Sequence, residues 1–221
     1  MMPSFTARAA KVAFAAAAWV AVSLGGASAA DSLKLTFVTH AAFFSHESGQ
    51  AKTLDPQVFV EDATAQEATG PQGIKHIVGF RPALIDQDAG TLKVFNAEGR
   101  PLGFDLAAWL GAMGVVEITD AAAGPVLTAT FSGLRPGGVY SLFENHFDQK
   151  PVTFTPMDGD GTNNNFVAAA DGSAKISMKI AQMPTHANAV LLVYHSDGVA
   201  HGGERGPIGV GAHHQLIARP E

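Results

Sequence analysis

The 221-residue sequence contains no cysteine, which excludes disulfide bonds, thiolate metal sites and thiol catalysis. Charged residues are scarce, at 15% of the chain, and the 14 basic residues are outnumbered by 20 acidic ones. The resulting net charge of −6 argues against binding to nucleic acids or to anionic membranes. We therefore expect no nucleic-acid partner.

The N-terminal segment has the three parts of a secretory signal peptide. Arg8 and Lys11 provide a basic start, an uncharged apolar stretch runs to Leu24, and Ala27-Ser28-Ala29 offers small residues for cleavage. The apolar stretch is shorter than the roughly 20 residues of a spanning helix, which favours a signal peptide over a membrane anchor. We predict that residues 1–29 are removed and that the mature protein is periplasmic or secreted, with no membrane span.

The mature chain retains 12 basic residues against 20 acidic ones, a net charge of about −8. Its length of about 190 residues suits a single domain with a sizeable core. We predict one domain over residues 30–221, with an elaborated N-terminal part over residues 30–90. Without disulfide bonds, an exported domain depends on that core for its stability.

Short apolar or alternating segments between turn residues predict a mainly β protein, an antiparallel β-sandwich. Residues 174–180 alternate most regularly, with lysines on one face and apolar side chains on the other. The polar stretch 47–73 predicts a long loop or an insertion. The predicted strands are 33–39, 74–80, 91–96, 115–119, 126–131, 139–144, 152–154, 166–169, 174–180, 189–195 and 215–218.

One short helix is predicted near residues 105–113. Asp105 is a favourable N-cap residue, and Gly114 is a suitable end for the run. The residues expected on its apolar face are Leu106, Trp109, Leu110 and Met113.

Three motifs in the second half carry a resemblance to known proteins. Leu134 to Tyr140 has the pattern L-x-P-G-x-x-Y, Phe166 to Ala174 has an Asp-Gly hairpin turn, and Tyr194 to Gly198 reads Y-H-x-D-G. In this order, over residues 90–218, they resemble a group of uncharacterised exported bacterial β-sandwich proteins with fibronectin-type-III-like architecture. The resemblance implies a sandwich fold and no established activity.

The histidines suggest a metal site, because four of the nine follow the apolar strand 189–194 in a Gly-rich segment. If the last strand returns beside that strand, these imidazoles converge, with Asp197 and Glu204 nearby and His146 as an additional ligand. Neutral imidazoles bind zinc or copper. Alternatively, they are turn and loop residues, since no H-x-H or H-E-x-x-H spacing occurs. The predicted zinc or copper ligands are His146, His195, His201, His213 and His214.

A second candidate is the polar loop 157–165, where Asp158, Asp160 and Asn163 alternate as in the start of a calcium loop. It lacks the closing glutamate of an EF-hand. The alternative is a tight polar turn, for which Asp, Gly and Asn are equally suitable.

Signatures of hydrolases and nucleotide-binding enzymes are missing, including G-x-S-x-G and S-x-x-K followed by K-T-G, and no residue is assigned a catalytic role. Our first hypothesis is a non-enzymatic exported binding protein for an unidentified protein or small ligand, with its site at the His/Gly-rich loop end. The second is a periplasmic copper- or zinc-binding protein, and the third is a metal-dependent enzyme at the same loops.

Overall fold

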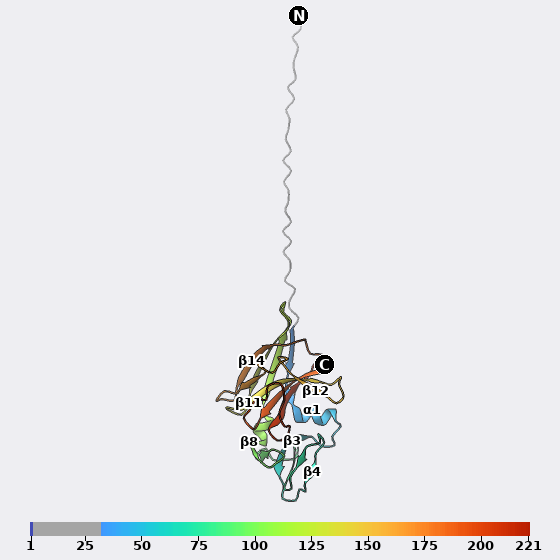
Figure 1. The fold of residues 1–221 in the computed structure, drawn as a ribbon, viewed down its shortest axis with the longest axis vertical. Helices are drawn as coiled ribbons and strands as arrows, with labels where there is room; N and C mark the ends of the chain where they lie inside the picture. Colours follow the sequence, from blue (N-terminus) through green and yellow to red (C-terminus); the bar gives the residue numbers. More distant parts are fainter. Residues whose placement is uncertain (2–31) are drawn as a thin grey trace.

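The computed structural model describes Met1 and residues 32–221, so the predicted signal peptide lies almost wholly outside the described residues. The described chain is mainly β and antiparallel, as the sequence predicts. Two sheets form its upper part in Figure 1, and a third sheet forms its lower end beneath them.

Sheet A has four strands in the order β1-β9-β10-β14. Apolar residues alternate with exposed polar ones along it, as the period of two in the sequence indicates. Its strands are β1 (Ser32–Thr36), β9 (Met113–Thr119), β10 (Val126–Ser132) and β14 (Ala174–Lys179).

Sheet B has the order β12-β11-β15-β16-β2, and β13 also pairs with β11. Its central strand is buried along its whole length, because both of its faces are covered. The strands are β2 (Val38–Thr39), β11 (Val139–His146), β12 (Thr153–Pro156), β13 (Asn165–Val167), β15 (Asn188–His195) and β16 (Ala212–Ala218).

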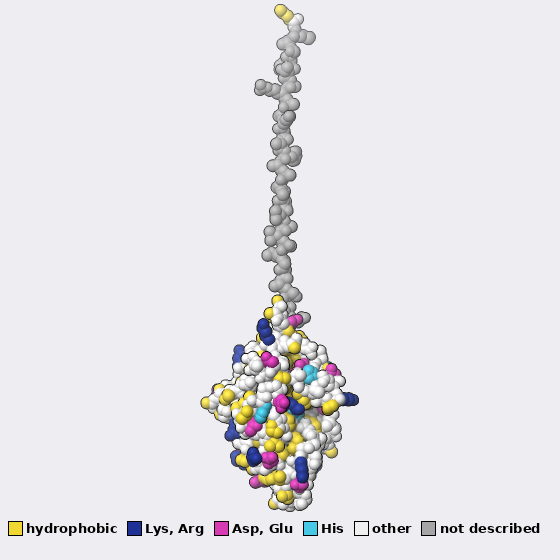
Figure 2. Space-filling view, in the orientation of Figure 1, with side chains coloured by type: hydrophobic (Ala, Val, Ile, Leu, Met, Phe, Trp, Pro, Cys, Tyr) yellow, Lys and Arg dark blue, Asp and Glu magenta, His cyan; other side chains and the backbone are white. Residues whose placement is uncertain are grey.

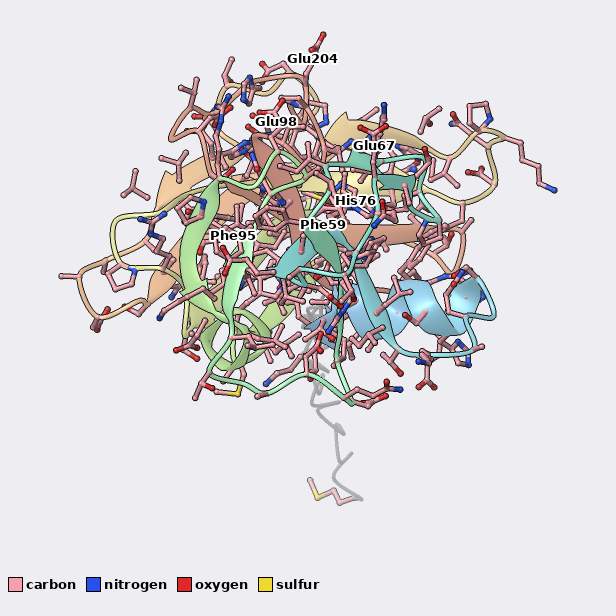
Figure 3. The ribbon with its side chains drawn as sticks, turned by 90° about the horizontal axis from the view of Figure 1, so that it is seen from below. Phe59, Glu67, His76, Phe95, Glu98 and Glu204 are labelled. Carbon is pink, nitrogen blue, oxygen red and sulfur yellow. The ribbon has the colours of Figure 1, made fainter. Side chains whose placement is uncertain are left out.

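Sheet C, at the lower end, has the order β6-β3-β7-β8. Phe59 and Phe95 lie opposite each other on neighbouring strands of this sheet, seen from below in Figure 3. Its strands are β3 (Leu54–Glu61), β6 (Phe80–Leu84), β7 (Lys93–Phe95) and β8 (Pro101–Asp105), and a small separate pair is formed by β4 (Ala68–Thr69) and β5 (Lys75–His76).

The main core lies between sheets A and B and continues into sheet C. Ile118 of sheet A, Leu192 of sheet B and Val58 of sheet C are all fully buried in it. Each such side chain contributes about 1.5–3 kcal/mol by leaving water. Tyr140, from the L-x-P-G-x-x-Y motif, is buried here too, and its hydroxyl accepts a hydrogen bond from the Arg135 backbone N–H at 2.9 Å.

The opposite face of sheet B carries a second, smaller apolar cluster that includes Phe143, Leu191 and Val193. The helix α1 (His40–Glu47) and residues of the loop after β15 pack over this face. His195 of β15 and His214 of β16, which are described below, lie on this covered face. His213 of β16 lies on the other face, toward the main core.

The structure corrects three details of the predicted elements. Residues 47–73 are not one long loop, because the run around Val58 forms the buried strand β3. The predicted strand 74–80 is divided, since Lys75–His76 forms β5 and Phe80 begins β6. The segment around Asp171-Gly172 is a turn but not a hairpin, since β13 pairs with β11 and β14 pairs with β10.

The predicted helix is present but shorter, as α2 (Leu106–Leu110). Asp105 is its N-cap, with Oδ1 accepting from the Ala108 N–H at 2.8 Å. The helix ends at Leu110, and Met113 begins β9 instead and is exposed. A second helix, α1, was not predicted; it follows β2 directly and has Thr39 as its N-cap.

Candidate metal centre

His195 is the last residue of β15, which is hydrogen-bonded to β11 on one side and β16 on the other. The alternation of the strand puts His195 on the same face as Leu191 and Val193, away from the core between sheets A and B. Only 1% of the residue is exposed. A central strand therefore holds this imidazole in a fixed position.

The loop from residue 196 to 211 folds back over His195. The Ser196 N–H donates to the Gly211 carbonyl at 2.8 Å, which closes the loop at its base. Within it, the Val199 N–H donates to Asp197 Oδ1 at 3.1 Å. The imidazole rings of His195 and His201 consequently lie 5.4 Å apart, centroid to centroid.

His195, Asp197 and His201 form a group whose ligand atoms all lie within 4.8 Å of one another. His201 Nε2 is 2.9 Å from Asp197 Oδ2. Two atoms bound to one zinc ion at 2.0–2.1 Å lie about 3 Å apart, so this pair is already spaced as ligands would be. In residues 32–221, no other group of three His, Cys, Asp or Glu side chains is clustered in this way.

The two ring nitrogens of His195 have different surroundings. Nε2 is 2.8 Å from the hydroxyl of Ser141, which lies on β11, on the same sheet face and diagonally across from His195. Nδ1 is buried and has no hydrogen-bond partner. With Nε2–H donated to Ser141, Nδ1 carries the lone pair, as in histidine metal ligands that are oriented by a second hydrogen bond.

His195 is neutral at physiological pH. Burial lowers its pKa to about 4, His201 lowers it further, and Asp197 opposes both effects. Asp197 and His201 are partly exposed, with side-chain exposures of 33% and 27%. The group therefore combines one rigid, buried imidazole with two ligands that an ion can reach from solvent.

Two glycines make room for the exposed ligands. A Cβ added at Gly211 would lie 2.5 Å from Asp197 Oδ2, and one at Gly206 would lie 2.6 Å from Cδ2 of His201. A hollow of about 230 Å³ borders Asp197 and is also lined by Arg100 and Ser196. The backbone of Gly206 and Gly211 therefore packs closely against His201 and Asp197, and a small hollow lies beside Asp197.

The other predicted zinc or copper ligands lie elsewhere. His213 points into the core, with Nδ1 3.1 Å from the Gln57 carbonyl and Nε2 3.0 Å from the Ser196 hydroxyl. His146 pairs with Asn188 at the opposite end of β15, roughly 20 Å from His195 along the strand. Its Nε2 is 2.9 Å from the Thr155 hydroxyl.

His214 is on the same face of sheet B as His195, but it is paired with His40 and Arg205 instead. Glu204, the other carboxylate near the predicted site, is exposed and points outward from its loop (Figure 3). The structure therefore brings together His195 and His201 with Asp197, and it leaves His146, His213, His214 and Glu204 outside the group.

The calcium candidate is a closed polar loop. Asp158 accepts from the backbone N–H groups of Gly161 and Asn163, at 2.8 and 2.5 Å. Asp160 Oδ1 accepts from the backbone N–H and the hydroxyl of Thr162. These oxygens stabilise the turn, which is the alternative role that the composition of the loop suggested, and calcium binding stays a prediction.

Sequence reasoning missed Ser141, because nothing local marks a serine 54 residues before His195 as its partner. Only the pairing register of β11 with β15 reveals the contact. It missed His40 for the same reason, since that residue meets His214 across 174 positions.

No protein-family model, curated protein or solved structure matches the chain. The resemblance of residues 90–218 to exported β-sandwich proteins therefore stays a prediction. Among the described residues, no helix has the length and apolar character needed to cross a membrane. Figure 2 shows basic, acidic and histidine side chains intermingled on one face of the molecule.

Proposed function

We propose that this protein is an exported zinc-binding protein whose ion is held by His195, Asp197 and His201. The observation that carries the proposal is the clustering of these three ligand atoms within 4.8 Å around an imidazole whose buried Nδ1 has no other partner. Two imidazoles and a carboxylate suit zinc in a cysteine-free chain. The N-terminal segment, which has the pattern of a signal peptide, supports export.

Three protein ligands leave a fourth position on a tetrahedral zinc ion. In this protein, that position is filled by water or by a group from a binding partner. The proposed metal site thus also gives a concrete form to the hypothesis of a binding protein with its site at the His/Gly-rich loops.

Calorimetric titration of the EDTA-stripped full chain with zinc tests the proposal. We expect one zinc ion per chain, and an affinity about tenfold or more weaker in His201→Ala, because one of three ligands is lost. His46→Ala is the matched control, since the His46 side chain is 87% exposed and lies outside the group. Absence of zinc binding, or equal loss in both variants, contradicts the proposal. Tighter, saturable binding of copper at the same residues would replace zinc by copper.

A second candidate is a zinc-dependent hydrolase at the same place, favoured by the hollow of about 230 Å³ that borders Asp197. A zinc-bound water with a lowered pKa is the nucleophile of such enzymes. Hydrolysis of p-nitrophenyl acetate by the zinc-loaded chain, absent without zinc and in His201→Ala, would support it. Equal rates with and without zinc would exclude this assignment.

A further inference from the structure

A second hollow, of about 370 Å³, opens on the covered face of sheet B, between β12 and residues 203–206 of the loop after β15. Its volume is that of a pocket for a small molecule. Val152 and Phe154 line it from the side of β12. Two charged residues, Glu204 and Arg205, line it from the side of the loop.

Arg205 is held at this hollow by two contacts. Its guanidinium lies 3.2 Å above the ring centroid of Phe154, and its Nη1 lies 2.9 Å from Nε2 of His214. Because a guanidinium can only donate, His214 is the acceptor, and burial keeps that imidazole neutral by lowering its pKa well below the usual range. The arginine is therefore oriented before any ligand arrives, which reduces the entropy lost on binding.

The remaining donors of Arg205 are free. Within residues 32–221, its Nε and Nη2 make no hydrogen bond, and neither is buried, so both are open to solvent. These two nitrogens form the edge of a guanidinium that receives a carboxylate through two parallel hydrogen bonds. Arg205 thus presents an unoccupied binding edge on a fixed side chain.

The charge of Arg205 is not neutralised by the protein. Among the residues that the structure describes, the arginines with salt bridges are Arg81, Arg100 and Arg219. Burial lowers the pKa of Arg205 to about 10, with no carboxylate opposing the shift, so the side chain is charged at neutral pH. Arg219 also lies over a phenylalanine ring, but Glu47 balances it at 3.0 Å. A half-buried charge without a counterion favours a bound anion.

Glu204 limits the charge of that anion. Its carboxylate lines the same hollow, but the residue is exposed and points outward from the loop (Figure 3). It forms no salt bridge with Arg205 and does not raise the pKa of the guanidinium. One negative charge on a ligand is therefore attracted by Arg205, whereas a second one in the same hollow is repelled by Glu204.

We infer that this hollow binds a small monocarboxylate with an apolar body. The carboxylate accepts from Nε and Nη2 of Arg205, the edge turned away from His214, which does not line the hollow. The apolar body contacts Val152, whose side chain is available because the residue is 39% exposed. None of the three proposed zinc ligands lines this hollow, so the inference does not rest on the zinc proposal.

Titration of the EDTA-stripped full chain with 3-phenylpropanoate tests the inference against the neutral isostere, 3-phenylpropanamide. We expect saturable binding of the carboxylate, about tenfold or more tighter than that of the amide, because the amide loses the charge-assisted hydrogen bonds. Equal or tighter binding of the amide, or no saturable binding of either compound, would overturn the inference. Because EDTA removes zinc throughout, the result is independent of whether the zinc proposal holds.

The two stacked arginines provide a matched pair of variants. We expect Arg205→Gln to weaken binding of 3-phenylpropanoate about tenfold or more, and Arg219→Gln to weaken it less than about twofold, because only Arg205 lines the hollow. Circular dichroism verifies that each variant is folded. Equal weakening in both variants would overturn the assignment of Arg205.

Glu204 provides a second test, which serves even if Arg205→Gln does not fold. Since Glu204 is exposed, Glu204→Gln should fold. We expect this variant to bind the dicarboxylate phenylsuccinate about threefold or more tighter than the wild type does, because a repulsion is removed. Glu117→Gln, an exposed position on sheet A, is the matched control and should leave that affinity unchanged. Unchanged affinity in Glu204→Gln, or an equal gain in both variants, would place the ligand elsewhere and overturn the inference.

Discussion

The candidate metal centre depends on how single residues around His195 are arranged. A neutral imidazole offers a metal only one nitrogen, so the other nitrogen must be engaged elsewhere in the correct tautomer. Ser141 can do this, because its hydroxyl lies 2.8 Å from His195 Nε2 and accepts from that nitrogen in the tautomer that leaves Nδ1 free. Ser141 is thus a positioning residue for the proposed site and does not touch the ion.

Ser141→Ala should weaken zinc binding by about 10–100-fold, because the ring of His195 loses the contact that fixes its orientation and tautomer. Calorimetric titration with zinc measures the effect. Ser177→Ala is the control, since its hydroxyl contacts that of Thr128 on sheet A, away from the group. Ser141→Thr, which keeps a hydroxyl, should recover part of the affinity. A Ser141→Ala chain that binds zinc as the wild type does would show that this contact is only structural.

Gly211→Ala should weaken zinc binding without removing any ligand. The new Cβ would lie 2.5 Å from Asp197 Oδ2, so the carboxylate must leave its present position 2.9 Å from His201 Nε2. Gly203→Ala is the matched control on the same loop, because a Cβ there has no heavy atom within 4 Å. The same titration compares the two, and equal affinities would mean that the position of Asp197 does not matter.

At the scale of elements, Asp55 joins β3 to α2. Its Oδ2 accepts from Trp109 Nε1 at 2.9 Å, and its Oδ1 accepts from the backbone N–H groups of Gln57 and Val58. Burial raises the pKa of this carboxyl to about 6, although the three donors oppose that shift. Sheet C therefore contains a buried carboxyl group, that of Asp55, whose pKa is about 6.

This acid should make the folding stability of the wild type depend on pH in a way that Asp55→Asn does not share. Folded Asp55 keeps its proton up to about pH 6, whereas an unfolded aspartate loses it near pH 4. The unfolding free energy therefore falls as pH rises through this window. Relative to Asp55→Asn, we expect the wild type to lose up to about 3 kcal/mol in urea unfolding between these pH values. A difference that stays flat or increases with pH would contradict the raised pKa.

The sequence predicts elements well where one face of a strand is buried and the other is not. β14 follows this pattern, and its alternation is visible in the sequence. β3 does not, because six of its eight residues are buried and two of these, Asp55 and Gln57, are polar, so its period is lost. β13 and β14 are separated by only a short turn but belong to different sheets, because β13 pairs with β11 and β14 pairs with β10, and no local pattern reports this.

For the molecule as a whole, the sequence indicates the region of the site but not its ligand set. His213 and His214 are adjacent in a strand, so their side chains must point to opposite faces, and only one can be near His195. The predicted strand 215–218 leaves both residues outside it, so this argument requires the structure, in which β16 begins at Ala212. The pairing of His214 with His40 likewise depends on where α1 lies across sheet B, which is a property of the tertiary structure.

Zinc should stabilise the whole fold, because His195 is in a central strand and His201 is in the loop that covers it. With zinc at about 100 times its dissociation constant, we expect about 2.7 kcal/mol of added stability and a melting temperature raised by several degrees. Thermal unfolding followed by circular dichroism measures this. Calcium serves as the comparison ion, and a shift with calcium alone would direct attention to Asp158 and Asp160.

The most direct test of the central claim is an anomalous difference map at the zinc absorption edge, from crystals grown with one equivalent of zinc. The account predicts one peak, about 2.0–2.2 Å from a nitrogen of His195, a nitrogen of His201 and a carboxylate oxygen of Asp197. A peak between His40 and His214, or no peak on residues 195–201, would contradict it.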